Sequence, residues 1–332
     1  MSEISATTTR ARSGSGLRGR FDAVMERFGS QAIVYVIFLG IIAFFAVYAP
    51  SFATGSSLAN IGRQTAAITI VAVGMTLVII NGEIDLSVGA TVSLTGALAA
   101  VLMSNGWPML AAVLVALAVG AGIGAFNGLV TAYIGVPSFL VTLGMLEAVG
   151  AGALMLTKTV AIPITSVAFT TVFGAGSLLG IPIAVLWAAL VVLAGIFVLR
   201  KTIYGRWVYA TGGNRSAATY SGVNTKRVVL ISFVVSGLLA TLAGLLLSGR
   251  AGAGDPTVGT GMELAAIAAV ILGGTDLFGG KGSVVGTVIG ALFIGVVGIG
   301  LILLGANAQL QQFITGAIII GAVAVNRLGR RR

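Results

Sequence analysis

Long apolar runs follow one another along most of the chain, and short polar segments separate them. Most runs approach the roughly 20 residues that a helix needs to cross a bilayer. The apolar positions are continuous rather than alternating, which favours helices over the strands of a membrane barrel. Ten runs are expected to be membrane helices: 33–49, 58–80, 86–103, 109–132, 139–156, 183–199, 228–247, 262–272, 283–304 and 310–325.

The pattern therefore predicts an all-α membrane protein with about ten transmembrane helices, some of them re-entrant or broken. The run 262–272 is the shortest, and its length is compatible with either a full span or a half-helix that re-enters. Composition supports a membrane protein, since 57% of the 332 residues are hydrophobic and only 8% are charged. A typical soluble domain is about 25% charged.

The composition also limits the chemistry. The chain contains no Cys and no His, which excludes disulfides, thiol catalysis and nearly all zinc sites. The Gly-rich segment 274–283 lacks the spacing of a phosphate-binding loop and follows a membrane run instead of a strand. We therefore expect no enzyme activity, no cofactor, no metal and no nucleotide site in this chain.

Most of the 19 Lys and Arg residues fall into three clusters, at residues 10–27, 200–227 and 327–332. Cytoplasmic segments are enriched in basic residues, so all three are expected to face the cytoplasm. Six spans before residue 200 and four after it satisfy this rule and place 157–182 outside. Membrane orientation thus accounts for the net charge of +10 without a nucleic-acid partner. The predicted organisation is a partly disordered tail (1–29), a transmembrane domain (30–326) and a basic C-terminus (327–332).

Two segments resemble each other. Residues 81–89 and 273–280 each follow an apolar run, contain Asp-Leu and precede a glycine-spaced helix. Transporters are often built from repeats whose interrupted helices meet near the transport pathway. Glycines that recur every fourth residue mark helix faces that allow close approach, and we expect them to form packing seams within one bundle. These glycines are Gly120, Gly124, Gly128, Gly282, Gly286 and Gly290.

Inserting a charged acidic side chain at the bilayer centre costs at least about 2.5–3.5 kcal/mol of free energy, so acidic residues inside apolar stretches need an explanation. The candidates for lining or gating a pathway, together with one neighbouring serine, are Glu83, Asp85, Ser87, Glu147, Glu263 and Asp276. Asp85 has a structural alternative, because an Asp before a helix caps its first amides. Glu147 has another, a pair with Lys158 at the membrane interface.

The basic segment 200–227 contains a pattern that predicts a short helix. Asn214 is suited to cap a helix over residues 216–220, and Gly222 is suited to end it in the left-handed conformation. Such a helix is a plausible docking element for a cytoplasmic partner. An ordinary basic loop that only sets the orientation is the alternative.

Three stretches, 72–89, 204–223 and 256–282, resemble the permeases of bacterial monosaccharide ABC importers. The resemblance implies a permease fold in the bacterial cytoplasmic membrane, with membrane lipid around it and both termini inside. It implies a cytoplasmic ATPase, an extracytoplasmic sugar-binding protein and a second permease copy, identical or similar. The residues that it assigns to coupling with the ATPase are Asn214, Arg215, Ser216, Ala217, Ala218, Tyr220 and Gly222.

The chain departs from this family at two positions. Glu83 stands where a glycine is usual, and Asp276 stands where Ser or Ala is common. The function that the resemblance implies is sugar import by alternating access, driven by ATP hydrolysis in the partner. A proton-coupled secondary transporter of a small solute, with Asp85 and Glu147 as proton carriers, is the alternative.

Overall fold

The computed structural model describes residues 35–329, and most of them are helical. The helix Tyr35–Tyr48 comes first. It is followed by α2 (Gly55–Ile80), α3 (Val88–Ser104), α4 (Met109–Leu129), α5 (Ser138–Thr157), α6 (Val167–Thr170), α7 (Ile183–Lys201), α8 (Ile203–Gly213), α9 (Arg215–Tyr220), α10 (Thr225–Ala251), α11 (Met262–Leu272), α12 (Val284–Leu303) and α13 (Ala308–Gly329).

Short elements complete the fold. Two π-helical turns, η1 (Val130–Ile134) and η2 (Thr171–Ala175), continue α4 and α6. Strand β1 (Ile162–Pro163) pairs antiparallel with β4 (Ala253–Gly254), and β2 (Ser177–Leu178) pairs antiparallel with β3 (Ile181–Pro182). The described strands are two residues long and form two separate two-stranded sheets, which join connecting loops.

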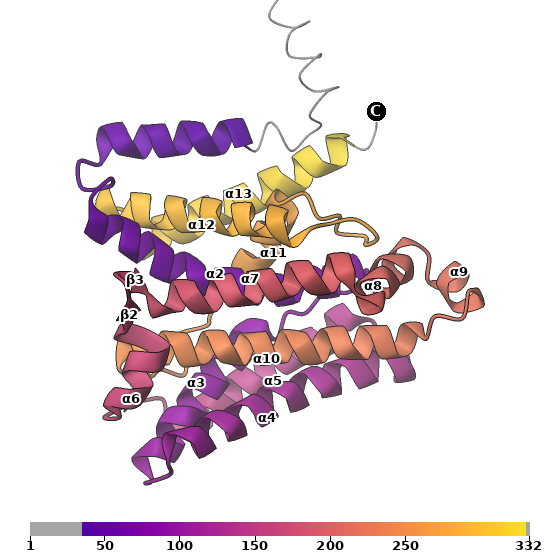
Figure 1. Ribbon diagram of the computed structural model, residues 1–332, viewed down its shortest axis with the longest axis horizontal. Coiled ribbons are helices and arrows are strands. Elements are labelled where there is room, and N and C mark those ends of the chain that lie inside the picture. The colour runs from indigo at the N-terminus through magenta and orange to yellow at the C-terminus, as the bar shows by residue number, and fades with distance from the viewer. Residues whose placement is uncertain (1–34, 330–332) are drawn as a thin grey trace, which may run out of the picture.

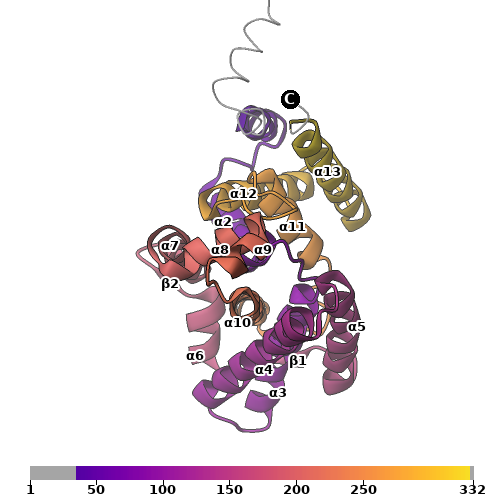
Figure 2. The same cartoon turned by 90° about the vertical axis from the view of Figure 1, so that its right-hand side faces the viewer.

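The long helices lie side by side, with α10 near the centre of the bundle (Figures 1 and 2). Helix α10 packs most extensively against α4, α2 and α3. The two ends of the bundle differ: α8 and α9 lie at one end, and α6, β2 and β3 lie at the other (Figure 1). The predicted tail 1–29 and the last three residues lie outside the described part of the chain.

All ten predicted runs fall on helices, but the number of spans is not confirmed. Within residues 35–329, six helices are long and apolar enough to cross a membrane: α2, α4 with η1, α5, α7, α10 and α12. Helix α3 is shorter than predicted because residues 81–87 are not helical, so it begins only at Val88. Helix α11 has 11 residues and begins after Gly261, whose φ is +83°.

The bundle contains two non-helical interruptions, the first break (residues 81–87) between α2 and α3 and the second break (residues 273–283) between α11 and α12. They are the two segments whose sequences resemble each other. They lie close together, since the Gly280 amide of the second break donates a 2.9 Å hydrogen bond to the carbonyl of Ile80, the last residue of α2 before the first break. The second break turns at Gly279 and Gly280, which adopt positive φ values of 90° and 77° that other residues rarely reach.

The spaced glycines lie at close contacts within the chain. A Cβ on Gly120, Gly124 or Gly128 would collide with the backbone of α10. Gly286 and Gly290 face the carbonyls of Gly273 and Ala269 with equally little room. Gly282 lies against the side chain of Thr275, 2.6 Å from where its own Cβ would be. These glycines let backbones approach within one bundle.

Replacing Gly124 with Leu is expected to separate α4 from α10, because its Cβ would overlap the carbonyl oxygen of Phe233. Overpacking of this kind typically costs about 1–3 kcal/mol. Thermal unfolding in detergent, followed by tryptophan fluorescence, measures the loss. Gly122→Leu on the same helix is the matched control, since nothing lies within 4 Å of a Cβ there. Equal melting temperatures for the two variants would contradict a tight α4–α10 seam.

Candidate functional site

The first break requires hydrogen-bond partners from other helices, since backbone groups in a membrane protein must be satisfied internally. Helix α5 supplies two of them. The Ile84 amide donates to Ser138 Oγ at 3.1 Å, and the Ile84 carbonyl accepts from Thr142 Oγ1 at 3.2 Å. Both side chains belong to the first turns of α5. The first break is thus held by α5 as well as by the two helices that it connects.

Asp85 joins the first break to α10. Its Oδ1 accepts from the amide and the hydroxyl of Ser87, at 3.1 and 2.7 Å, and its Oδ2 accepts from Ser236 Oγ at 2.9 Å. Asn127 of α4 donates to Ser87 Oγ at 2.8 Å. Asp85 and Ser87 are each only 1% exposed, so neither faces a cavity in this conformation.

Asp85 is not the N-cap of α3, although it accepts from the Ser87 amide just before that helix. The N-cap of α3 is Ser87, and its side chain makes no capping hydrogen bond. Asp85 lies two residues earlier and uses its second carboxylate oxygen on α10 instead. Its role in the fold is to connect helices that are distant in the sequence.

A second polar connection runs from the first break to α8. Asn81 Nδ2 donates to Ser232 Oγ of α10 at 2.6 Å, and Ser232 Oγ is also 2.6 Å from the Tyr204 hydroxyl of α8. Burial raises the pKa of Tyr204 to about 12. The tyrosine hydroxyl therefore remains protonated and keeps this connection at physiological pH.

Helix α8 touches the second break and the end of α2, next to the first break. A Cβ on Gly212 would collide with the Ile80 carbonyl oxygen and lie 2.7 Å from the Gly280 amide nitrogen. Tyr209 donates a 2.8 Å hydrogen bond to the Gly282 carbonyl. Helix α8 thus links the end of α2, next to the first break, with the second break.

Sequence reasoning treated residues 200–227 as a loop with one short helix and missed α8. Two signals for α8 were present. Thr202 accepts from the Gly205 amide as an N-cap at 3.1 Å. The buried positions Gly205, Val208 and Thr211 recur at the spacing of one helix face.

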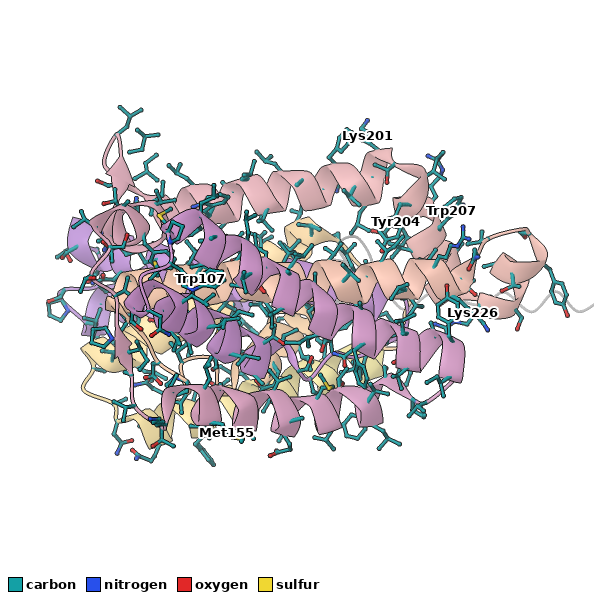
Figure 3. The ribbon with its side chains drawn as sticks, turned by 90° about the horizontal axis from the view of Figure 1, so that it is seen from below. Trp107, Met155, Lys201, Tyr204, Trp207 and Lys226 are labelled. Atoms are coloured by element: carbon teal, nitrogen blue, oxygen red, sulfur yellow. The ribbon has the colours of Figure 1, made fainter. Side chains whose placement is uncertain are left out.

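The predicted capped helix is present as α9. Asn214 Oδ1 accepts from the Ala217 amide at 2.9 Å, and Gly222 after the helix has a φ of +85°. The helix begins at Arg215, one residue earlier than predicted. It projects beyond the rest of the bundle (Figure 1), and Figure 3 places Lys201, Trp207 and Lys226 at the same end.

The burial of the residues of α9 corrects the prediction that Ala218 takes part in docking. Arg215, Ser216, Ala217 and Tyr220 are exposed, and Tyr220 is 93% exposed. Ala218 is only 5% exposed, because it faces the rest of the protein. Ala218 therefore holds α9 against the protein and is not available to a docking partner.

Arg215 links α9 to the first break through an ion pair. Its guanidinium lies 2.6 Å from Glu83 Oε1, and the Glu83 side chain is 11% exposed while that of Arg215 is 47% exposed. The pair lies in the wall of a cavity of about 550 Å³. Other side chains of this cavity come from η1, α9 and the start of α10: Thr131, Thr219, Thr225 and Lys226.

The remaining acidic candidates lie apart from this pair. Glu147 is exposed on α5 and forms no ion pair with Lys158, contrary to the interfacial pair considered above. Glu263 is buried in the first turn of α11. Asp276 is buried in the second break, where its Oδ1 accepts from the Phe278 amide at 2.9 Å. The structure thus brings α9, Glu83 and the two breaks together at one end of the bundle.

Comparison with known proteins places this arrangement in a family. Residues 57–323 match the family described as branched-chain amino acid transport system, permease component. The ribose import permease of Escherichia coli K12 is 42% identical over 297 residues, which cover 88% of this chain and 92% of the relative.

Two other relatives from the same organism carry the names of other sugars. The D-allose transport system permease is 35% identical over 97% of this chain and 98% of its own length. The xylose transport system permease is 35% identical over 90% of this chain and 93% of its own length. No solved structure matches the chain. By the extent of these matches, the chain belongs to the permease family of bacterial monosaccharide ABC importers.

Proposed function

We propose that this chain forms the translocation pathway of an ATP-driven monosaccharide importer and works by alternating access. The observation that carries the proposal is α9, an exposed capped helix tied by an ion pair to an interruption between two membrane helices. A permease that is driven by a separate ATPase needs such an element to receive motion from it. Relatives named for ribose, allose and xylose support a sugar as the substrate.

The proposed coupling route starts at the exposed face of α9, residues Ser216, Ala217 and Tyr220. Movement of α9 passes through Arg215 to Glu83 and so to the first break. Asp85 and Ser236 carry it to α10, the central helix. Helix α8 carries it in parallel to the second break through Gly212 and Tyr209.

The proposed assembly has a cytoplasmic ABC ATPase at the α9 end and a sugar-binding protein at the opposite end. A second permease copy completes the pathway. The basic residues at the α9 end, which are Arg200, Lys201, Arg206, Arg215, Lys226 and Arg227, support a cytoplasmic location for that end. This orientation gives ten crossings with both termini in the cytoplasm of a bacterial inner membrane.

Uptake by the permease, co-expressed with its ATPase and reconstituted in liposomes, tests this function. We expect labelled ribose, xylose or allose to accumulate only with ATP and the binding protein present. Leucine should not compete, although the family description names branched-chain amino acids. A protonophore should leave uptake unchanged. Accumulation that needs no ATP and stops with the protonophore would establish a proton-coupled transporter instead.

A further inference from the structure

A non-helical segment, residues 253–261, which consists of the short strand β4 followed by turns, enters the bundle along α3. Near its start, Gly254 lies against Ala97 and Ala100, where its Cβ would be 2.6 Å from the Ala100 Cβ. Near its end, the Gly259 amide donates to Ser93 Oγ at 2.9 Å. The segment thus follows α3 inward from the end of the bundle opposite α9.

The depth of this segment follows from helix geometry. Helix α3 ends at Ser104, so at about 1.5 Å per residue Ser93 lies roughly 16 Å from that end. The hydrocarbon core of a bilayer is about 30 Å thick. Gly259 is therefore near the middle of the membrane, where α11 begins at Met262. Non-helical backbone at this depth occurs only where protein covers it or where it lines a water-filled cavity.

The polar side chains of the segment distinguish these two cases. Thr257 and Thr260 are exposed, while Gly254 and Gly259 are buried against α3. Thr257 donates its hydroxyl to Asp255 Oδ1 at 2.7 Å. Among the residues that the structure describes, no side chain or backbone group bonds to the Thr260 hydroxyl. One face of the segment is therefore packed and the other is polar and uncovered.

We propose that residues 255–261 line the translocation pathway and that Thr257 and Thr260, with Asp255, bind the hydroxyl groups of the passing monosaccharide. The proposal rests on the proposed function and adds the contact residues to it. Hydroxyls and one carboxylate supply both donors and acceptors, which a neutral polyol matches without a counter-charge. A few hydrogen bonds of modest net strength hold a solute weakly enough to release it.

The absence of cysteine in the chain allows a direct test. Single-cysteine variants Thr257→Cys and Thr260→Cys, in the assembled transporter, would be treated with a charged, water-soluble methanethiosulfonate. We expect both to react at least roughly tenfold faster than Leu193→Cys, a control on the exposed face of α7, because a thiol in lipid does not ionise. If Thr260→Cys reacts as slowly as this control, the segment faces lipid or protein and the proposal is overturned.

Substrate contact is tested by removing one hydroxyl without changing the shape of the side chain. Thr260→Val is expected to raise the KM for sugar uptake roughly fivefold, the effect of losing one ordinary hydrogen bond. Thr260→Ser, which keeps the hydroxyl, should stay near the original KM. An unchanged KM in Thr260→Val would overturn sugar binding by this residue.

Two further readouts separate sugar binding by this segment from docking of the sugar-binding protein and from failure of transport. If Thr260→Val raises the concentration of sugar-binding protein needed to stimulate ATP hydrolysis, the segment is a docking site, and the inference is overturned. Thiol labelling needs no transport, so it reports on the pathway even if the unmodified assembly fails to import sugar. That failure would reject the proposed function, while slow labelling would reject only the present inference.

Discussion

Replacing Ala217 with Trp is expected to abolish ATP-driven uptake while the protein still inserts and folds. Ala217 is exposed on α9, beside Tyr220, so the larger side chain projects from the exposed face of the helix and blocks a partner that fits it. A few well-placed residues carry most of the energy of an interface. Tyr220→Ala should therefore also weaken ATPase binding, roughly tenfold or more.

The measurement is the amount of ATPase that co-purifies with each permease variant, together with uptake in the same cells. Ala168→Trp is the matched control, because Ala168 is exposed on α6 at the opposite end of the bundle. Neither α9 variant removes a basic residue. Normal ATPase retention and normal uptake in Ala217→Trp would leave α9 as a basic segment that only sets the orientation.

The second large effect concerns the ion pair between α9 and the first break. Glu83→Arg would place two cations together beside Lys226, and Arg215→Glu would place two carboxylates together. We expect each change to lower the rate of uptake roughly tenfold, which corresponds to about 1.4 kcal/mol. This free-energy loss lies between those typical of exposed and of buried ion pairs, because the Arg215 side chain is half exposed while the Glu83 side chain is only 11% exposed.

The exchanged pair, Glu83→Arg with Arg215→Glu, is expected to recover most of the lost uptake, since the two side chains again attract each other. Lys158→Glu, a charge reversal at an exposed position at the end of α5, should leave uptake unchanged. Additive losses in the double variant would show that the two residues act independently. The coupling route from α9 to the first break would then need another carrier.

Features set by local patterns were predictable from the sequence. The apolar runs gave the helices, and Asn214 with Gly222 gave the capped helix, because an N-cap and a left-handed glycine act over a few residues. The glycine spacing located helix faces that approach each other closely. In each case the residues that decide the structure lie within one or two helical turns.

Features set by distant contacts were not predictable in the same way. Glu83 and Arg215 are 132 positions apart, and nothing in either local sequence indicates their pairing. Which of two adjacent alanines faces a partner depends on how α9 lies on the bundle, so Ala217 and Ala218 were treated alike. The local sequence around Asp85 resembles a helix start. Its partner on α10, Ser236, lies far along the chain, so their hydrogen bond could not be predicted from that local sequence.

The contact between the two breaks also has a consequence for biosynthesis. The Ile80 carbonyl accepts from the Gly280 amide, and Asp85 accepts from the Ser236 hydroxyl. Both hydrogen bonds can form only after residues much later in the chain have been synthesised. At about 5–20 residues per second, the ribosome needs roughly 10–40 seconds to add the 200 residues from Ile80 to Gly280. Helices α3 to α5 are synthesised within that interval and before α10, so Asp85 is at first without its α10 hydroxyl. The first half of this permease therefore reaches its final packing only after the second half has been inserted.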